Sequence, residues 1–239
     1  MKPEQTIRHA LIMAAGRGNR MRPLSDFLPK AMLPYKGDTL IGNSLTMLSQ
    51  CVSFVHVTVG YKRAMLSQYL MERGVDSILN TEGHGNGWWI GHTLLQYLNE
   101  PVLVLTTDNV TELDIEFLTC EYNRLGDPAC MLVPVVPIPM IEGDYITHEN
   151  GLVRRVHREL PTEIYCSGIQ VLNPAKVCSL LQNGSAPDGE ASLPENFNTI
   201  WDGLIPLEQL KVSKIYPKAW FSIDTFEQLV TLTHENRNA

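Results

Sequence analysis

Residues 10–34 read ALIMAAGRGNRMRPLSDFLPKAMLP, and this stretch is the most informative part of the chain for its fold. Residues 10–15 form a short, continuous apolar run, which is typical of a strand that is covered on both faces. Two glycines, Gly16 and Gly18, follow the run directly. A buried strand that ends in a glycine-rich loop predicts an α/β protein with a ligand site at the carboxyl end of its sheet.

Outward from this stretch, strand-like and helix-like segments alternate through the first half of the chain. Patterns of apolar residues predict helices at 40–48, 62–71, 88–98 and 113–123, and strands at 54–59, 75–79 and 101–105. This order favours parallel strands with helices on both faces of the sheet. We therefore predict an α/β fold of the Rossmann-like three-layer type, with a mixed, mostly parallel central sheet.

The second half has a different pattern. The segment 131–138 carries prolines, which predict an irregular or edge segment. The pair Asn150-Gly151 predicts a hairpin between strands 145–148 and 152–157. Further strands are expected at 164–172, 211–216 and 220–223, a loop at 183–195, and a final helix at 224–234. Because no segment has the composition of a linker, we expect one domain over residues 1–239, with a core of 1–125 and a second half of 126–239.

Composition excludes several classes of protein. The formal net charge of −7 over 239 residues does not indicate a nucleic-acid binder, which usually has a basic surplus. Five widely spaced cysteines predict reduced thiols in a cytoplasmic protein and do not favour a zinc site. No run approaches the ~20 apolar residues of a membrane span, and the polar start does not resemble a signal peptide. The sequence leaves the oligomeric state open.

The charge of the glycine-rich loop differs from that of the whole chain. Residues 16–30 include four basic residues, Arg17, Arg20, Arg22 and Lys30, and one acidic residue, Asp26. Such a local surplus predicts an anion site. A dinucleotide fingerprint would place a third glycine at Met21, and a P-loop motif is absent, so neither of these phosphate-binding loops is present.

The same residues carry a specific resemblance. Residues 11–24 and 28–34 closely resemble the signature of sugar-phosphate nucleotidylyltransferases, L-A-A-G-x-G-[ST]-R-[ML]-x-P-L-T followed by P-K-x-[LM]. Asn19 departs from it, since the family usually has Ser or Thr there. The resemblance implies a nucleotide-diphospho-sugar transferase fold, with Arg20 on the triphosphate and Lys30 at the reacting phosphate. It also implies nucleotide binding by Ala14, Ala15, Gly16, Gly18 and Asn19.

Two aspartates extend the resemblance. Asp108 follows a predicted strand, and Asp224 lies in the context IDTFEQL at residues 223–229, close to the [VI]-D-T-x-E-x-L motif of the family. The resemblance implies that both bind Mg²⁺, a metal that prefers carboxylate oxygens. An alternative for Asp224 is a helix N-cap, with Glu227 completing a capping box. Thr107 stands where sugar enzymes usually have glycine.

The remaining predicted site residues concern the nucleobase and the acceptor. By resemblance, Asn80, Gly85 and Asn86 lie at the base, whereas His84 is a loop residue and the tryptophans at 88 and 89 belong to the core. Residues 168–174 resemble the acceptor-side pattern G-I-x-[VI]-L-x-P. Acceptor binding is therefore expected from Asn109, Glu159, Ser167 and Gly168, although a solvated hairpin face is an equally good interpretation of the charges around Glu159.

The predicted substrates are an NTP and a phosphorylated small molecule. The resemblance implies Mg-dependent nucleotidyl transfer to a sugar 1-phosphate, in nucleotide-sugar biosynthesis for cell-surface polysaccharides. Phosphocholine is the alternative acceptor. Three features favour it: Asp108-Asn109 in place of the usual Gly-Asp, the pair Asn80 and Asn86 followed by aromatic residues, and Trp201 ahead of the last strands, since an aromatic wall could hold a quaternary amine. An alternative of another class is a catalytically silent nucleotide-sugar-binding regulator, which would lack the lysine or the aspartates. Neither the base nor the acceptor is specified.

Overall fold

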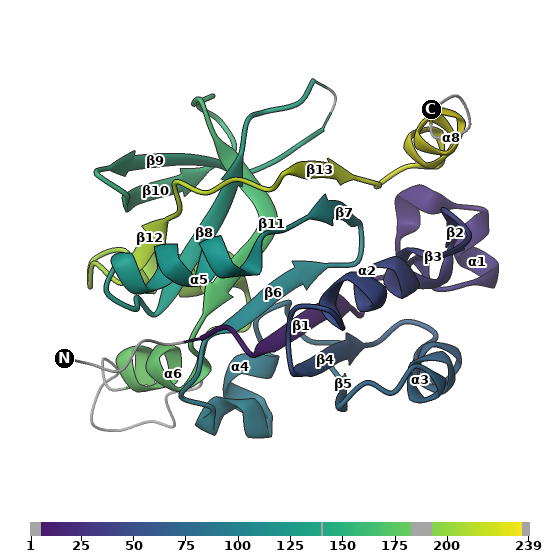
Figure 1. Cartoon of the computed structure of the whole chain (residues 1–239), viewed down its shortest axis with the longest axis horizontal. Coiled ribbons are helices and arrows are strands. Elements are labelled where there is room, and N and C mark those ends of the chain that lie inside the picture. Colours follow the sequence, from purple (N-terminus) through teal and green to yellow (C-terminus); the bar gives the residue numbers. More distant parts are fainter. Residues whose placement is uncertain (1–5, 140, 183–192, 236–239) are drawn as a thin grey trace.

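A computed structural model describes residues 6–139, 141–182 and 193–235 of the chain. Its centre is a nine-stranded mixed sheet with the order β5-β4-β1-β6-β11-β8-β12-β10-β9 (Figure 1). The first four strands in that order are parallel, and they are β5 (Ser77–Asn80), β4 (Phe54–Val59), β1 (His9–Ala14) and β6 (Val102–Thr106). The predicted strands of the first half are therefore confirmed to within two residues.

The other half of the sheet is mainly antiparallel. Only β12 and β8 pair in parallel there, and the remaining neighbours run in opposite directions. The strands are β11 (Tyr165–Leu172), β8 (Cys130–Val135), β12 (Leu210–Val212), β10 (Leu152–His157) and β9 (Tyr145–Glu149). The predicted hairpin is confirmed, with Asn150 and Gly151 at φ 52° and 82° between β9 and β10. Such left-handed turn residues match the twist of a two-residue hairpin.

Alternation along the strands creates two apolar layers. In β1, Leu11 packs into one cluster, whereas Ala10 and Ile12 pack into another on the opposite face. The first cluster is closed by α4 (Trp89–His92), α6 (Pro174–Gln182) and α7 (Phe197–Leu204). The second is closed by α2 (Leu40–Leu48), α3 (Arg63–Glu72) and α5 (Ile115–Arg124). The three-layer class predicted from the sequence is confirmed.

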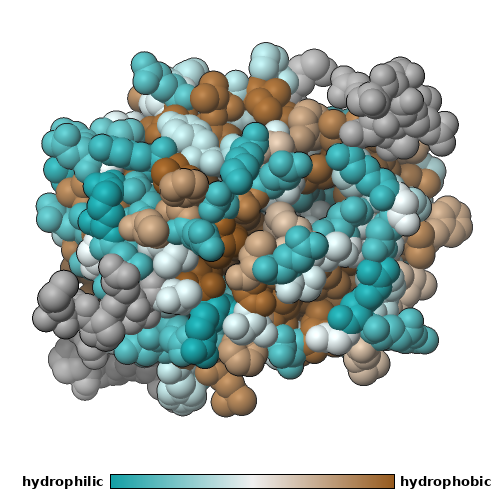
Figure 2. Space-filling model, in the orientation of Figure 1, coloured by the Kyte–Doolittle hydropathy of each residue, from teal (hydrophilic) through white to brown (hydrophobic). Residues whose placement is uncertain are grey.

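The outer face agrees with this layering. On the face shown in Figure 2, many hydrophobic side chains lie recessed between hydrophilic ones near the middle. Helices that pack an apolar side against a sheet give this pattern, since their polar sides remain in water. Within the described ranges, no helix is long and apolar enough to span a bilayer.

Two predictions about secondary structure are wrong, and the strand expected at 211–216 is shorter, because β12 covers only residues 210–212. Residues 130–135 form β8, a fully buried interior strand, although an irregular or edge segment was expected at 131–138. Pro134 is tolerated because β12 pairs only with residues 130–132, so no ladder bond is needed from Pro134 on that side. On its other side, Pro134 faces a bulge in β11 between Cys166 and Ile169.

The helix expected at 88–98 is interrupted. It consists of α4 and a 3₁₀ turn, η3 (Leu94–Tyr97), which are separated by Thr93 in an extended conformation. The Thr93 hydroxyl donates to the carbonyl of Trp89 at 2.8 Å and accepts from the N–H of Leu95 at 3.2 Å. This side chain ends one helix and begins the next, which hydrophobic spacing does not reveal. The loop expected at 183–195 lies mostly outside the described residues.

Small elements complete the fold around the loop after β1. Two strands, β7 (Asn109–Glu112) and β13 (Ala219–Ser222), form a separate antiparallel pair, and β2 (Pro34–Tyr35) pairs with β3 (Asp38–Thr39). The final helix α8 (Phe226–Glu235) lies beside α1 (Leu24–Phe27) in Figure 1. A third apolar cluster, which includes Met21, Leu33 and Ile223, joins these segments. Two further 3₁₀ turns are η1 (Asn19–Met21) and η2 (Lys30–Met32).

Candidate functional site

The loop that follows β1 forms one wall of a cavity of about 740 Å³. Gly18 has a left-handed backbone, with φ 63°, and a Cβ at this position would lie 2.8 Å from Cβ of Lys30. Glycine is therefore required by both conformation and space. Every residue that the sequence placed at the triphosphate lines this cavity, namely Ala14, Ala15, Gly16, Gly18, Asn19, Arg20 and Lys30.

Strand pairing brings the two predicted aspartates to this cavity. Asp108 directly precedes β7, and Asp224 follows β13 by two residues. Asn109 and Ser222 are paired in register, and the N–H of Ile223 donates to the carbonyl of Asp108 at 2.9 Å. A short antiparallel ladder thus places residues from the middle and the end of the chain at the same point.

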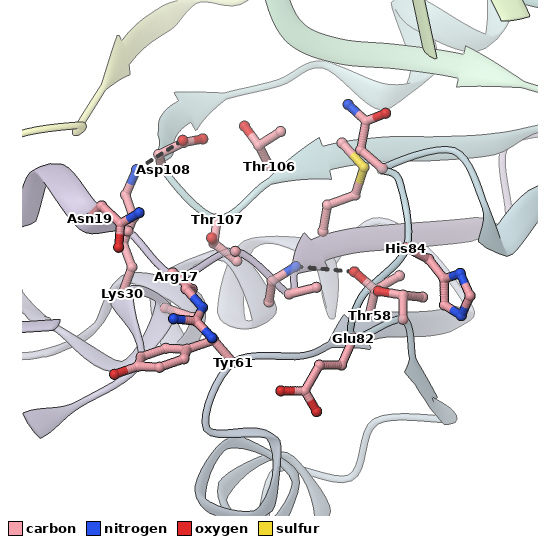
Figure 3. Close-up of a pocket in the computed structure, with 18 of the residues that line it drawn as sticks. Arg17, Asn19, Lys30, Thr58, Tyr61, Glu82, His84, Thr106, Thr107 and Asp108 are labelled. Carbon is pink, nitrogen blue, oxygen red and sulfur yellow. Dashed lines mark hydrogen bonds and ion pairs between the residues drawn. The ribbon is translucent and has the colours of Figure 1, made fainter. Parts of the chain in front are cut away.

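Lys30 bridges the two aspartates. Its Nζ lies 2.9 Å from Oδ2 of Asp108 and 3.0 Å from Oδ1 of Asp224 (Figure 3 shows the first pair). Arg20 lies 3.1 Å from the same oxygen of Asp224. Burial would raise the pKa of Asp224, but the charges of Lys30 and Arg20 outweigh it and lower the pKa. The carboxylate of Asp224 therefore keeps its negative charge at neutral pH in an environment that already includes cations.

These carboxylates fit a divalent cation. Both oxygens lie within 3.0 Å of a single ammonium nitrogen, so they already converge on one positively charged group. No group of three or more potential metal-ligating side chains occurs among the described residues. A hard cation at Asp108 and Asp224 would therefore draw its other oxygen ligands from substrate and water, as Mg²⁺ commonly does.

A second loop, residues 81–87, lies across the cavity from Lys30. Figure 3 shows Lys30 and Asp108 on one side, and Glu82 and His84 on this loop on the other. The loop is tied to residues before α7 by hydrogen bonds from Gly85 N to Glu195 Oε2 at 3.1 Å and from Gly87 N to Glu195 O at 2.7 Å. A Cβ on Gly85 would lie 2.3 Å from the Glu195 carbonyl oxygen, so this close approach requires glycine.

The predicted base-binding residues differ in position. Gly85 and Asn86 line the cavity, but the oxygen of Asn86 already accepts a hydrogen bond from the N–H of Phe197 at 3.0 Å. Asn80 is exposed and is not among the described residues that line the cavity. Its oxygen accepts from the N–H of Glu82 at 3.2 Å, which shapes the turn into the loop. The next residue, Thr81, is buried and lines the cavity instead.

Trp88 and Trp89 lie at the start of α4, and one of them is a core residue. Trp89 is 1% exposed and packs in the first apolar cluster, as predicted. Trp88 is only partly buried and stacks between His84 and His92, with ring centroids 4.2 and 4.8 Å away. His84 also lies 3.5 Å from Glu195, so its contacts support the loop.

A second, smaller cavity of about 220 Å³ shares Met13, Asn86, Thr106 and Asp108 with the first. Three of the predicted acceptor residues, Asn109, Ser167 and Gly168, line it. The Ser167 hydroxyl donates to the carbonyl of Val133 at 2.5 Å and accepts from the N–H of Ile169 at 3.1 Å. Ser167 therefore shapes the β11 bulge, whereas the Nδ2 of Asn109 is buried without a partner among the described residues.

The structure does not bring Glu159, the fourth predicted acceptor residue, to this cavity. Glu159 is exposed, whereas the preceding Arg158 lines the cavity and donates to Oδ1 of Asp144 at 2.7 Å. That carboxylate raises the pKa of Arg158. Arg158 and Glu159 lie in a bend directly after β10, so no strand alternation places them, and the charges alone did not show which of the two lines the cavity.

Sequence reasoning missed several residues of the second cavity. Gln170 lies two positions after Gly168 on β11, so strand alternation could have identified it. Glu142 and Asp144 come from the segment between β8 and β9, where no pattern indicated a site. The aromatic part of the lining consists of Phe197, Trp201 and Trp220.

Comparisons with known proteins agree with this geometry. A family model described as MobA-like NTP transferase domain matches residues 10–138. A mannose-1-phosphate guanyltransferase of Pichia angusta is 28% identical over 183 residues, which are 70% of this chain and 50% of the relative. The chain therefore spans about half the length of that protein.

Solved structures share the fold over almost the whole chain. A putative glucose-1-phosphate thymidylyltransferase from Bacillus anthracis superposes with a TM-score of 0.77 at 17% identity, covering 97% of this chain and 96% of the other. A CTP:phosphocholine cytidylyltransferase from Streptococcus pneumoniae has a TM-score of 0.73 at 16% identity, with coverage of 95% and 98%. At such identities these likenesses show the fold alone.

Proposed function

This chain belongs to the MobA-like NTP transferase family, and from that premise we propose that it transfers a nucleotidyl group from an NTP to a sugar 1-phosphate. The products are a nucleoside diphosphate sugar and pyrophosphate. One observation carries the proposal: Arg20, Lys30, Asp108 and Asp224 meet in the wall of the larger cavity, where a smaller cavity adjoins it at Asp108. A donor and an acceptor placed in the two cavities would meet at these charges.

The chemistry is an in-line displacement at phosphorus. An oxygen of the acceptor phosphate forms a bond to the α-phosphorus, and the bond from that phosphorus to the bridging oxygen of the β-phosphate breaks. Pyrophosphate leaves with the electron pair of that bond. No general base is required, because a phosphate monoester is already largely ionised at pH 7 (second pKa ≈ 6). Catalysis then depends on positioning and on charge neutralisation.

Each part of the site has a role in this reaction. The loop at Gly16–Asn19 and Arg20 hold the β- and γ-phosphates that leave as pyrophosphate. Lys30 offsets the negative charge that develops at the α-phosphate. Asp108 and Asp224 would hold Mg²⁺, which supplies charge neutralisation between donor and acceptor phosphates. The ammonium of Lys30 must then leave at least one of these carboxylates when the metal binds.

The test is a matrix of substrates. The purified protein with Mg²⁺ is incubated with each of the four common NTPs and dTTP, against glucose 1-phosphate, mannose 1-phosphate, inositol 1-phosphate and phosphocholine, and pyrophosphate is measured. We expect pyrophosphate release with one NTP and a sugar 1-phosphate. The variant Asp108→Asn should fold like the wild type and release no pyrophosphate. Absence of release with every pair would contradict the proposal.

A second candidate function is cytidylyl transfer to phosphocholine. The aromatic lining of the smaller cavity favours it, since indole faces attract quaternary ammonium groups. The same substrate matrix separates the two candidates. A silent regulator is disfavoured, because Arg20, Lys30 and both aspartates are present and in contact. We place the reaction in the cytoplasm, where NTPs are available and where the chain's free thiols stay reduced.

A further inference from the structure

The smaller cavity contains a buried hydrogen-bond donor that has no acceptor among the described residues. Asn109 is 6% exposed, and its Nδ2 has no partner in the part of the chain that the structure describes. The side chain lies beside Gly168, where even a Cβ would come within 3.0 Å of this nitrogen. An unpaired buried amide N–H has lost its hydrogen bonds to water, so an acceptor oxygen that reaches this nitrogen would be favoured.

Gln170 offers a second donor in the same cavity. It is 3% exposed, and its Oε1 accepts hydrogen bonds from Nε1 of Trp201 at 3.1 Å and from Sγ of Cys130 at 3.2 Å. An indole N–H can only donate, so the amide atom facing Trp201 must be the oxygen. The orientation of the amide is thereby determined, and its NH₂ group remains available to the cavity that Gln170 lines.

Two of the other lining groups are already engaged within the protein. The Nε1 of Trp220 donates to the carbonyl of Ser167 at 3.0 Å, and the carboxylate of Asp144 is paired with Arg158 at 2.7 Å. Arg158 thus neutralises the carboxylate of Asp144, and the carboxyl groups of Asp108 and Glu142 also line the cavity. A trimethylammonium group has no lone pairs, so it would leave the amide donors of Asn109 and Gln170 unpaired.

We propose that Asn109 and Gln170 determine acceptor specificity by donating hydrogen bonds to hydroxyl oxygens of a polyhydroxylated phosphate ester, a sugar or cyclitol phosphate. An acceptor without such oxygens would form neither of these two hydrogen bonds. This inference rests on the proposed function, since it assigns the smaller cavity to the acceptor. A site that hydrogen-bonds a substrate hydroxyl discriminates strongly against analogues that lack it.

The test uses three variants of the full chain. Asn109→Leu and Gln170→Met remove the amides at similar volume, and Gln170→Glu keeps an oxygen for Trp201 but removes the NH₂ donor. The matched control is Gln209→Met, which changes the same side chain outside both cavities, where its Oε1 accepts from the N–H of Ala129 at 3.2 Å. For each protein, KM and kcat are measured for the acceptors named above and for the NTP, and calorimetry measures acceptor binding without turnover.

We expect the wild type to prefer a polyhydroxylated acceptor over phosphocholine by about 100-fold in kcat/KM, since each hydrogen bond is worth about tenfold. Each cavity variant should raise the KM for that acceptor about tenfold, with an unchanged KM for the NTP and a change of less than about threefold for phosphocholine. Gln209→Met should match the wild type.

The outcomes separate this inference from the proposed function. Turnover with phosphocholine as the preferred acceptor, or an unchanged KM for the sugar phosphate in all three variants, would overturn the inference and leave nucleotidyl transfer standing. Calorimetric binding of a sugar or cyclitol phosphate that the variants lose, without pyrophosphate release, would support the inference and overturn the proposed function. Absence of both binding and turnover would overturn both.

Discussion

Replacement of Lys30 by Met should strengthen the binding of a divalent cation to the protein while abolishing turnover. In the structure, the ammonium lies 2.9 and 3.0 Å from the two carboxylates that would hold the metal. At about 3 Å, a pair of unit charges interacts by about 1 kcal/mol in water and by about 5 kcal/mol at an effective dielectric constant of 20. These side chains are partly exposed, so the true value lies between the limits.

A metal ion must displace this internal cation from at least one carboxylate before it binds. Removal of the ammonium should therefore raise the affinity for Mn²⁺, used as a probe for Mg²⁺, by at least about tenfold in the absence of substrates. Loss of one preorganised charge at the reacting phosphate should lower kcat by at least about 100-fold. Titration of free Mn²⁺ by electron paramagnetic resonance measures the first quantity, and pyrophosphate release measures the second.

Lys30→Arg is the matched control, because it keeps the positive charge. Its affinity for Mn²⁺ should stay close to that of the wild type, although the different shape of the guanidinium should still reduce turnover. An unchanged or weaker affinity for Mn²⁺ in Lys30→Met would refute the idea that lysine and metal compete for Asp108 and Asp224. Near-normal turnover in that variant would contradict the role of Lys30 in catalysis.

The same substitution changes the dependence of stability on pH. In the wild type the pKa of Asp224 is lowered, so its stabilising effect is present above the ordinary carboxyl pKa of 3.8 and is lost as the pH falls below it. Without Lys30, the effect of burial is opposed mainly by Arg20, and the pKa of Asp224 should rise. Metal-free Lys30→Met should consequently melt below the wild type at pH 7, and the difference should shrink as the pH falls towards 4.

Three further predictions concern other parts of the fold. Gly168→Ala should destabilise the protein by about 1–2 kcal/mol in urea melts, because φ is 79° there and the new Cβ would meet Asn109; it should also raise the KM for the acceptor only. Burial and the neighbouring His9 lower the pKa of His56 to about 4 in the folded protein. As the pH falls below 6.5, the ordinary value for histidine, His56 is therefore protonated in the unfolded chain before it is protonated in the folded protein. The free energy of unfolding should then drop by about 2–3 kcal/mol between pH 7 and pH 4, and by less in His56→Gln. A thiol reagent at pH 8 should label the exposed Cys51 and Cys120 in the native protein and all five cysteines after unfolding. Labelling of a third thiol at the same rate would contradict the buried positions of Cys130 and Cys178 and the partly buried position of Cys166.

The elements that the sequence predicted well are those in which one physical signal dominates. Continuous apolar runs identified β1, β4 and β6, and apolar spacing gave the bounds of α2 as residues 40–48. The residues expected at the triphosphate could also be grouped from the sequence, because Gly16–Lys30 is contiguous, and in the structure they line one cavity. Long-range pairing, in contrast, made Pro134 compatible with an interior strand, since β12 ends before it.

The smaller cavity depends on contacts that no local pattern encodes. Arg158 lines the cavity and Glu159 does not; both lie in the bend after β10, where Arg158 is held by Asp144, which is distant in the chain. Gln170 becomes a defined donor only through its bonds to Trp201 and Cys130, which are distant in the chain. Asn80 was expected at the base, but its local hydrogen bond to Glu82 turns it into a turn residue. Such side-chain contacts need the folded structure.

The central claim is that nucleotidyl transfer occurs where Lys30, Asp108 and Asp224 meet. The most direct measurement follows a radioactive label on the α-phosphate of the active NTP, with Mg²⁺ and the sugar 1-phosphate, in the wild type and in Asp224→Asn. We predict that the label moves into a nucleoside diphosphate sugar in the wild type, with one pyrophosphate released per labelled product. The rate of this transfer should fall by at least about 100-fold in the variant. Label that stays in the NTP, or that reaches the product equally fast in Asp224→Asn, would contradict the account.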